Sequence, residues 1–280
     1  MKTGLVLEGG GFRGIYTAGV LDVFLENGIS ADGVIGVSAG AVHGCSFLSG
    51  QKGRSIDYYT KYCNDPRFMS LKSFIKTGDV VGEEFAYHEL PEKLVPYDYS
   101  AFDRCGIPFY VTVTNLESGK PEYLRINDML TEIDYMRASA SLPYFSRIVE
   151  INGGKYLDGG CSDSIPIKAF REMGYGRNII VLTRHDGYTK KQEHGLLARL
   201  KYRKYPEFVK ALLGLQKRYN ETLEYIKMLE KNGEVFVIRP SRPLTIGRME
   251  HDPERVRAVY EIGVEDARRE MNALAQWLAK

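Results

Sequence analysis

The residues GVIGVSAGAV, at positions 33–42, combine a short run of β-branched residues with a glycine-flanked serine. The run 33–37 predicts a buried strand, and the small residues of 39–48 predict a helix directly after it. Ser38 lies between the two, with Gly36 and Gly40 on either side. Glycines there relieve the crowding of a tight strand-to-helix turn, which is the context of a nucleophile elbow. We therefore interpret Ser38 as a candidate nucleophile, while the same pattern also fits an ordinary glycine-rich turn.

A glycine loop precedes this unit. Residues 3–7 are an apolar run that predicts the first strand, and the run leads into GGGFRG at 9–14. The spacing of apolar residues in 15–26 predicts a helix that stops at Asn27-Gly28. Successive glycine amides form a concave nest for an anion. In an acyl-transfer enzyme that anion is the tetrahedral oxyanion, for which one preorganised donor contributes about 3 kcal/mol. We expect this oxyanion hole at Gly9, Gly10 and Gly11.

The same loop also matches the G-x-G-x-x-G fingerprint, so a dinucleotide-binding oxidoreductase is an alternative function. That fold requires an acidic residue at the carboxyl end of the second strand, where it binds the ribose. Here Asp32 precedes the second strand, and Ser38 follows its carboxyl end. The position of the acid therefore favours an oxyanion hole over a cofactor loop.

The rest of the chain continues to alternate between strands and helices. Further elements are expected as strands at 107–114, 122–126, 178–183 and 234–238, a hairpin at 148–157 turning at 152–154, and helices at 131–142, 206–231 and 253–280. The alternation predicts an α/β, three-layer fold with a mainly parallel central sheet covered by helices. Ligands of such sheets bind at the carboxyl ends of the strands, where the glycine loop and Ser38 are expected.

A third motif, Asp158-Gly159-Gly160, follows the strand-like residues 155–157. An aspartate followed by two glycines can approach another backbone closely, because glycine carries no Cβ. The commoner use of such a motif is a turn in which the carboxylate accepts local amides. On its own, the motif leaves both interpretations of Asp158 open.

The three motifs in this order, GGGFRG, GVSAG and DGG, resemble the patatin-like phospholipase family. The resemblance includes the approach to the aspartate, which is ASASLP at 138–143, Phe145, and YLDGG at 156–160. It covers residues 1–185, which we expect to form a patatin-like catalytic core with an early nucleophile elbow. Residues 186–280 are expected to form a helical and strand extension packed on the same domain.

The resemblance implies a serine–aspartate dyad that hydrolyses carboxylic esters of lipids or phospholipids. Ser38 would attack the ester carbonyl and form an acyl-enzyme, with Asp158 accepting the proton. Arg13 would belong to the oxyanion loop, as loop support or as charge stabilisation. No metal and no organic cofactor is implied. The glycines that support the motifs are Gly14, Gly36, Gly40, Gly159 and Gly160.

An ordinary aspartate is a weak base near neutral pH, so the dyad requires burial to raise the pKa of Asp158. A histidine is the alternative base, as in an α/β-hydrolase with a Ser-Asp-His triad. His185 is the best candidate because it follows a predicted strand, with His251 as the other way to assemble a triad. Only two strands precede Ser38, fewer than an α/β-hydrolase usually has, which disfavours this alternative. The candidates are His43, His88, His185, His194 and His251.

The composition indicates which kinds of partner to expect. The chain has 38 Lys and Arg against 36 Asp and Glu, which gives no global argument for nucleic acid. Its four cysteines include no CxxC pair and predict free thiols of a reducing compartment rather than a zinc site. We see neither a signal peptide nor a run of about 20 apolar residues that could span a membrane. We therefore expect a cytoplasmic protein that can contact a membrane peripherally, in an undetermined oligomeric state.

Residues 189–218 are the one strongly basic segment, in which only Glu193 and Glu207 are acidic. Phe208, Leu212 and Leu215 share one helical face within it. In an amphipathic helix, such a face packs into the core of the protein. Alternatively, the segment is a lid or surface helix that meets anionic lipid headgroups, which makes an anionic membrane a candidate partner.

Overall fold

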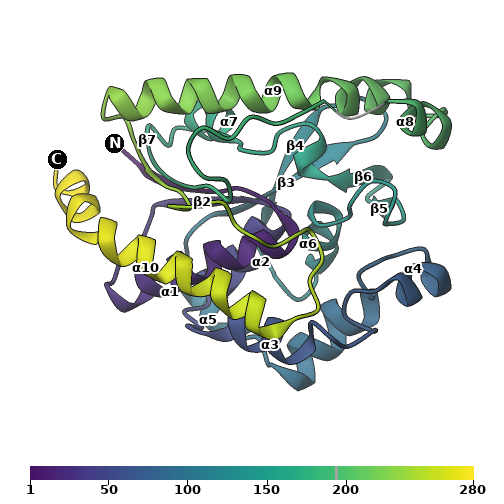
Figure 1. Cartoon of the computed structure of the whole chain (residues 1–280), viewed down its shortest axis with the longest axis horizontal. Coiled ribbons are helices and arrows are strands. Elements are labelled where there is room, and N and C mark those ends of the chain that lie inside the picture. Colours follow the sequence, from purple (N-terminus) through teal and green to yellow (C-terminus); the bar gives the residue numbers. More distant parts are fainter. Residues whose placement is uncertain (193–194) are drawn as a thin grey trace.

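Runs of aliphatic residues form the strands of one central sheet in the computed structural model, which describes residues 1–192 and 195–280 (Figure 1). The parallel part of the sheet has the order β3-β2-β1-β7-β8. All residues of β2 are buried, as expected for a strand that is covered on both faces. These strands are β1 (Thr3–Leu7), β2 (Gly33–Val37), β3 (Phe109–Asn115), β7 (Arg177–Val181) and β8 (Val235–Ile238).

Helices cover both faces of this sheet, so the predicted three-layer α/β fold is confirmed (Figure 1). On one face lie α7 (Ile167–Glu172) and α9 (Pro206–Lys231). On the other lie α1 (Ile15–Glu26), α2 (Ala39–Leu48) and α10 (Pro253–Leu278). Both long helices begin with proline, where the missing N–H costs no intrahelical hydrogen bond.

The strand β3 organises the antiparallel part of the sheet. Along one edge, β4 (Pro121–Ile126) pairs antiparallel with residues 109–114. Along the other edge, β2 pairs parallel with residues 109–112 and β6 (Gly154–Asp158) pairs antiparallel with 113–115. The strands β2 and β6 therefore lie end to end, and their carboxyl ends face each other. The predicted hairpin is β6 with β5 (Val149–Ile151).

Residues 50–106 contain helices that the sequence patterns did not predict. Their aromatic residues pack in several directions, as in the edge-to-face contact of Tyr59 with Phe12. The helix expected at 131–142 is also shorter and is α6 (Ile133–Ser139). The unpredicted helices are α3 (Arg54–Tyr62), α4 (Leu71–Thr77), the π-helix η2 (Phe85–Leu94), α5 (Tyr99–Cys105) and, farther along, α7 and α8 (Leu196–Lys201).

The C-terminal residues take part in the same sheet and its cover. The strand β8 pairs with β7, and α10 packs along α1. The two helices approach so closely that a Cβ at Gly19 would collide with the carbonyl oxygen of Tyr260, and one at Gly263 with that of Tyr16. Glycine at both crossing positions allows this approach, since larger residues would push the helices apart.

Candidate active site

Ser38 lies in a strained turn between β2 and α2. Its φ of 54° and ψ of −123° are uncommon for a residue with a side chain. Both flanking glycines are needed in this turn. A Cβ on Gly36 would lie 2.5 Å from the Cα of Ala41, and one on Gly40 would collide with the carbonyl oxygen of Leu7. The local geometry is that of a nucleophile elbow, which presents the serine side chain beyond the end of the sheet.

Ser139 and Ser141 connect this turn to the aspartate. The Ser38 amide donates a hydrogen bond to the Ser139 hydroxyl (2.9 Å), which donates to the carbonyl oxygen of Thr112 on β3 (2.7 Å). The carbonyl oxygen of Ser141 accepts the amide of Asp158 (2.8 Å). The chain leaves α6 here and ties the carboxyl ends of β2 and β6 together. Both serines belong to the stretch 138–143 that carries the family resemblance, but the sequence did not predict this positioning role.

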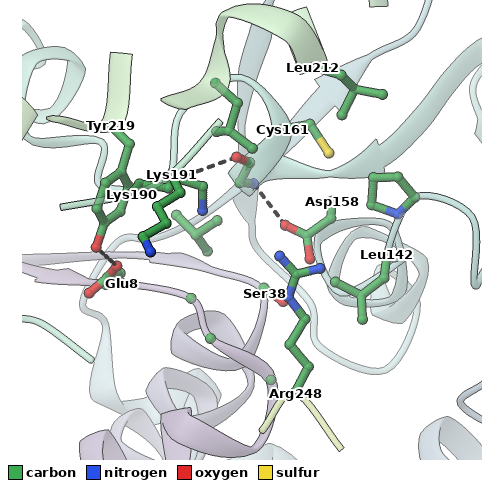
Figure 2. Close-up of a pocket in the computed structure, with 18 of the residues that line it drawn as sticks. Glu8, Ser38, Leu142, Asp158, Cys161, Lys190, Lys191, Leu212, Tyr219 and Arg248 are labelled. Atoms are coloured by element: carbon green, nitrogen blue, oxygen red, sulfur yellow. Dashed lines mark hydrogen bonds between the residues drawn. The ribbon is translucent and has the colours of Figure 1, made fainter. Parts of the chain in front are cut away.

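Asp158 ends β6 and is buried, with its carboxyl group beside Ser38 (Figure 2). Its Oδ1 accepts the Gly160 amide at 2.7 Å. Burial raises the pKa of Asp158 to about 6. Hydrogen bonding from the Ser38 hydroxyl and the Gly160 amide opposes this rise in pKa, as do the positive charges of Arg248 and Lys190. The carboxyl group therefore titrates near neutral pH while remaining in contact with the candidate nucleophile.

The glycine loop follows β1 and lines a cavity together with Ser38. Gly9 approaches the elbow so closely that a Cβ would lie 2.8 Å from the carbonyl oxygen of Val37. Gly11 has a φ of +58°, which favours glycine, and a Cβ there would lie 2.6 Å from the carbonyl oxygen of Arg248. Gly9 thus lies against the turn of the candidate nucleophile, Gly11 lies against the C-terminal region, and Gly10 lies between the two glycines.

Two further predicted glycines hold the motifs close together. A Cβ on Gly14 would lie 2.5 Å from that of Ala39, the residue after Ser38. Gly159 contacts the carbonyl oxygen of Thr112 so closely that no Cβ fits. These contacts place the glycine loop and the DGG motif at the end of the sheet that carries Ser38.

Glu8 and Arg13 place opposite charges beside the loop. The Glu8 carboxylate accepts the Tyr219 hydroxyl and the Thr183 amide, both at 2.6 Å. Burial raises the pKa of Glu8. Burial, together with the nearby charge of Arg184, lowers the pKa of Arg13 to about 10. Arg13 therefore stays positively charged at neutral pH.

Two cavities meet at Ser38. The larger cavity, of about 650 Å³, is lined by the glycine loop, Asp158 and several cationic side chains. The smaller, about 120 Å³, reaches the other side of the serine and has mainly apolar and aromatic walls. Both cavities include Gly11, Ser38 and Leu142 in their linings, so one group bound at Ser38 can extend into both.

The structure does not bring a described histidine to Ser38. None of His43, His88, His185 and His251 lines either cavity. His185 is half-buried, with Nδ1 2.6 Å from the carbonyl oxygen of Asp186, and His251 Nδ1 lies 2.8 Å from that of Cys63. His43 is buried, which lowers its pKa to about 3. His194, like Glu193, lies outside the described residues.

Asp32 lies before β2 and accepts the Thr3 amide at 2.7 Å, at the opposite end of the strand from Ser38. Among the described residues, no group of His, Cys, Asp and Glu is arranged to hold a metal ion. The four cysteines are free thiols.

The basic segment 189–218 divides into two parts. Phe208 is buried, and Leu212, Leu213 and Leu215 line the larger cavity, so the apolar face of α9 points into the protein. Lys190 and Lys191 also line this cavity (Figure 2). Around α8, by contrast, leucines are exposed. In the part of the chain that the structure describes, no helix has the length and apolar character to cross a membrane.

Arg248 is a site residue that motif analysis did not find. Its carbonyl oxygen accepts the Phe12 amide of the glycine loop at 3.2 Å. Its side chain extends toward Ser38 and Asp158 (Figure 2). It lies 90 residues beyond Asp158 in a loop without periodicity or motif, so no signal in the sequence pointed to it.

Comparison with known families gives two matches. A model described as patatin-like phospholipase matches residues 5–171, and a domain of unknown function (DUF6363) matches residues 205–279. An uncharacterised protein YjjU of Escherichia coli is 32% identical over 187 residues, which are 65% of this chain and 52% of that protein. The lysophospholipase NTE1 of Cryptococcus neoformans is 31% identical over 187 residues, 65% of this chain and 11% of the relative.

The chain thus matches about half of YjjU and about a tenth of the NTE1 protein. Saccharomyces cerevisiae NTE1, also named a lysophospholipase, is 30% identical over 177 residues, 61% of this chain and 10% of that protein. Among solved structures, VipD from Legionella pneumophila is similar, with a TM-score of 0.50 and 13% identity, over 97% of this chain and 67% of the other. This likeness concerns the fold alone.

Proposed function

This chain belongs to the patatin-like phospholipase family, and we propose that it is a lipid acyl hydrolase with Ser38 as nucleophile and Asp158 as general base. One observation carries the proposal: a serine in a strained elbow faces a buried carboxyl group with a pKa of about 6. The relatives named lysophospholipases support lipid esters as the substrate class. The proposed activity is hydrolysis of a carboxylic ester into a fatty acid and an alcohol.

The first half of the reaction forms an acyl-enzyme. The Ser38 hydroxyl oxygen attacks the ester carbonyl carbon, and its proton passes to the Asp158 carboxylate. The carbonyl oxygen becomes an oxyanion, which the amides of the glycine loop stabilise. Protonated Asp158 then gives the proton to the alcohol oxygen as that bond breaks. The alcohol leaves, and the acyl group remains esterified to Ser38.

The second half repeats these roles with water. Asp158 accepts a proton from a water molecule, whose oxygen attacks the acyl-enzyme carbonyl. The second oxyanion occupies the same glycine loop. When it collapses, the bond to Ser38 breaks, the proton returns to the serine oxygen and the fatty acid is released. Arg13, which we place in this loop, holds a positive charge near the developing anion.

The two cavities support a division of the substrate at Ser38. The smaller cavity has walls of aromatic and aliphatic side chains, including Val42, Tyr59, Leu90 and Met136. Burial of apolar chain is favourable by about 0.8 kcal/mol per methylene. We therefore assign the acyl chain to the smaller cavity and the alcohol part of the ester to the larger one.

Enlarging Val42, which lies one helical turn after Ser38, is expected to shorten the acceptable acyl chain. Excluding about two to three methylenes from the cavity, at about 0.8 kcal/mol each, makes Val42→Phe lower kcat/KM for an octanoyl ester at least about 30-fold more than for an acetyl ester. Val42→Ala, the matched control, is expected to shift the preference toward longer chains. A chain-length series of p-nitrophenyl esters measures both, and equal losses on all chain lengths would contradict the assignment.

The direct test of the proposed function is release of fatty acid from monoacyl lipids below their critical micelle concentration. Wild-type protein is assayed against acylglycerol and several lysophospholipids that share one acyl chain, with Ser38→Ala as the background. We expect hydrolysis well above that background. Release that does not exceed the Ser38→Ala background on any ester would overturn the proposal.

We also propose that the segment 189–218 meets anionic membrane surfaces through α8. Leu196, Leu197 and Leu200 of this helix are 70%, 57% and 66% exposed, and Leu197 lines the larger cavity. Arg199 and Lys201 lie on the same helix. Exposed leucines among basic residues support insertion into an anionic interface. The cavity would then open toward the lipid.

The double variant Leu196→Ser/Leu200→Ser is expected to weaken binding to phosphatidylglycerol vesicles about tenfold or more, because less apolar surface is buried. Cosedimentation with vesicles measures this. Met228→Ser removes a half-exposed apolar residue from α9 and serves as the control. Salt at about 0.5 M screens charges on the protein surface. Binding that is insensitive to this salt, or equally strong on phosphatidylcholine vesicles, would contradict the role of the basic residues.

A further inference from the structure

Resting on the proposed acyl hydrolase, we infer that the outer part of the larger cavity is an anion subsite that binds the phosphate of a lipid headgroup, and that residues 186–280 help to build it. Among the described residues that line the cavity, the cations are Arg13, Arg184, Lys190, Lys191 and Arg248. The match of residues 205–279 to a domain of unknown function assigns no role to this region.

Among the described residues that line this cavity, cationic side chains outnumber carboxyl groups. The carboxyl groups among its described lining residues are Glu8 and Asp158. Burial raises the pKa of each. The Glu8 oxygens already accept the Tyr219 hydroxyl and the Thr183 amide. Among these described residues, five cations stand against two carboxyl groups even when both carboxyl groups are ionised, which favours an anionic ligand.

Contacts with neighbouring groups hold Lys190 and Arg184 in place, and those of Lys190 come from α9. The Asn220 side chain accepts the Lys190 amide (2.9 Å) and donates to the Lys190 carbonyl oxygen (3.2 Å). The ammonium group of Lys190 lies 5.0 Å from the ring centre of Tyr219. The Arg184 guanidinium lies 4.2 Å from the ring centre of Tyr188. Aromatic and backbone contacts of this kind leave the cations charged while restricting where they point.

The C-terminal region also contacts the catalytic motifs themselves. Arg248 accepts the Phe12 amide through its backbone and directs its side chain toward Ser38 and Asp158 (Figure 2). Arg218 donates to the carbonyl oxygens of Cys161 (2.9 Å) and Ser162 (3.1 Å), directly after the DGG motif. We therefore place residues 186–280 in the same domain as the patatin-like core, as a part of its active site.

The position of the subsite selects a substrate class. An ester at Ser38 with its acyl chain in the apolar cavity places its glycerol and headgroup among the cations. A phosphate there gains charge-assisted hydrogen bonds from arginine and lysine. The quaternary ammonium of a choline headgroup meets like charge in the same space. We therefore assign monoacyl phospholipids with a net anionic headgroup as substrates.

The test compares three monoacyl lipids with one acyl chain: acylglycerol, acylglycerol 3-phosphate and the corresponding phosphocholine. In the wild type, kcat/KM is expected to be at least tenfold higher for acylglycerol 3-phosphate than for either of the others, on the scale of about 1.4 kcal/mol. Lys190→Gln and Arg184→Gln are expected to lower kcat/KM for the phosphate lipid at least fivefold more than for acylglycerol. Lys227→Gln, an exposed α9 lysine paired with Glu224, is the matched control and is expected to leave this preference unchanged.

Binding measurements separate failure of the subsite from failure of the proposed function. Titration calorimetry of glycerol 3-phosphate is expected to show binding that weakens at least fivefold in Lys190→Gln, whether or not any ester is hydrolysed. Inorganic phosphate is expected to compete with the lipid substrate if a headgroup is the natural ligand. Inhibition by free phosphate that does not compete would instead indicate a regulatory anion and contradict the headgroup assignment. Hydrolysis with no preference for the phosphate lipid, or binding that Lys190→Gln leaves unchanged, would overturn the subsite.

Discussion

Replacing Ser38 with alanine is expected to lower kcat for ester hydrolysis by about 10⁴-fold or more, because no other group can carry the acyl intermediate. Alanine removes only the hydroxyl oxygen. The Ser38 amide, which donates to Ser139, and the glycine loop remain in place. Substrate binding should therefore persist while turnover is lost. Fatty-acid release measured with the best monoacyl substrate gives the rate of each protein.

The control for Ser38→Ala is a measurement of its folding stability. Ser38 has a φ of 54°, and alanine at this position carries the same backbone strain, so the two proteins should unfold at closely similar urea concentrations. A Ser38→Ala protein that remains folded and keeps more than about 1% of wild-type activity would contradict the role of Ser38 as nucleophile.

Replacing Asp158 with asparagine is expected to lower kcat/KM by about 10³-fold, within the range for loss of a general base. Asparagine has nearly the same shape, and its carbonyl oxygen can still accept the Gly160 amide. It cannot accept the serine proton. The Ser38 hydroxyl therefore stays a poor nucleophile, although its position is kept. Single-turnover kinetics with an activated ester isolate the acylation step that should be slowed.

The pH profile gives this variant a second, independent readout. Asp158 acts as a base only when ionised, and burial raises its pKa to about 6. In the wild type, kcat/KM should rise with pH, level off above about 6, and fall about tenfold per pH unit below that value. This acidic limb should be absent from Asp158→Asn. A wild-type limb that persists in Asp158→Asn would show that another group is the base.

The local parts of the site could be predicted from the sequence because they depend on short-range sterics. The bounds of β1, β2, α1 and α2 agree with the predicted ranges. Gly36 and Gly40 stand where the structure leaves no room for a Cβ. The requirement at Gly36 comes from the nearby Ala41, so the sequence records it directly, whereas the requirement at Gly40 comes from Leu7 on the neighbouring strand β1.

The relation between Ser38 and Asp158 could not be predicted in the same way. It depends on two strands sharing one edge of β3: β2 pairs with residues 109–112, and β6 pairs antiparallel with residues 113–115. Local patterns do not encode the direction or the neighbour of a strand. The family resemblance suggested the pair, and the end-to-end arrangement of β2 and β6 is the physical reason that it can form.

The cationic side of the cavity was also beyond the reach of local patterns. The basic segment 189–218 suggested a single surface, but Lys190 and Lys191 line the cavity while Arg199 and Lys201 lie on α8. Arg248 carries no sequence signal at all. These residues meet because α9 and the loop before α10 pack against the glycine loop, which is a tertiary contact rather than a local one.

The most direct measurement of the central claim is labelling with a fluorophosphonate, which forms a covalent bond to an activated serine. The account predicts that wild-type protein gains one probe mass on the peptide that contains Ser38, that Ser38→Ala gains none, and that Asp158→Asn is labelled far more slowly. A wild-type protein that stays unlabelled, or a Ser38→Ala protein that labels equally well, would contradict it.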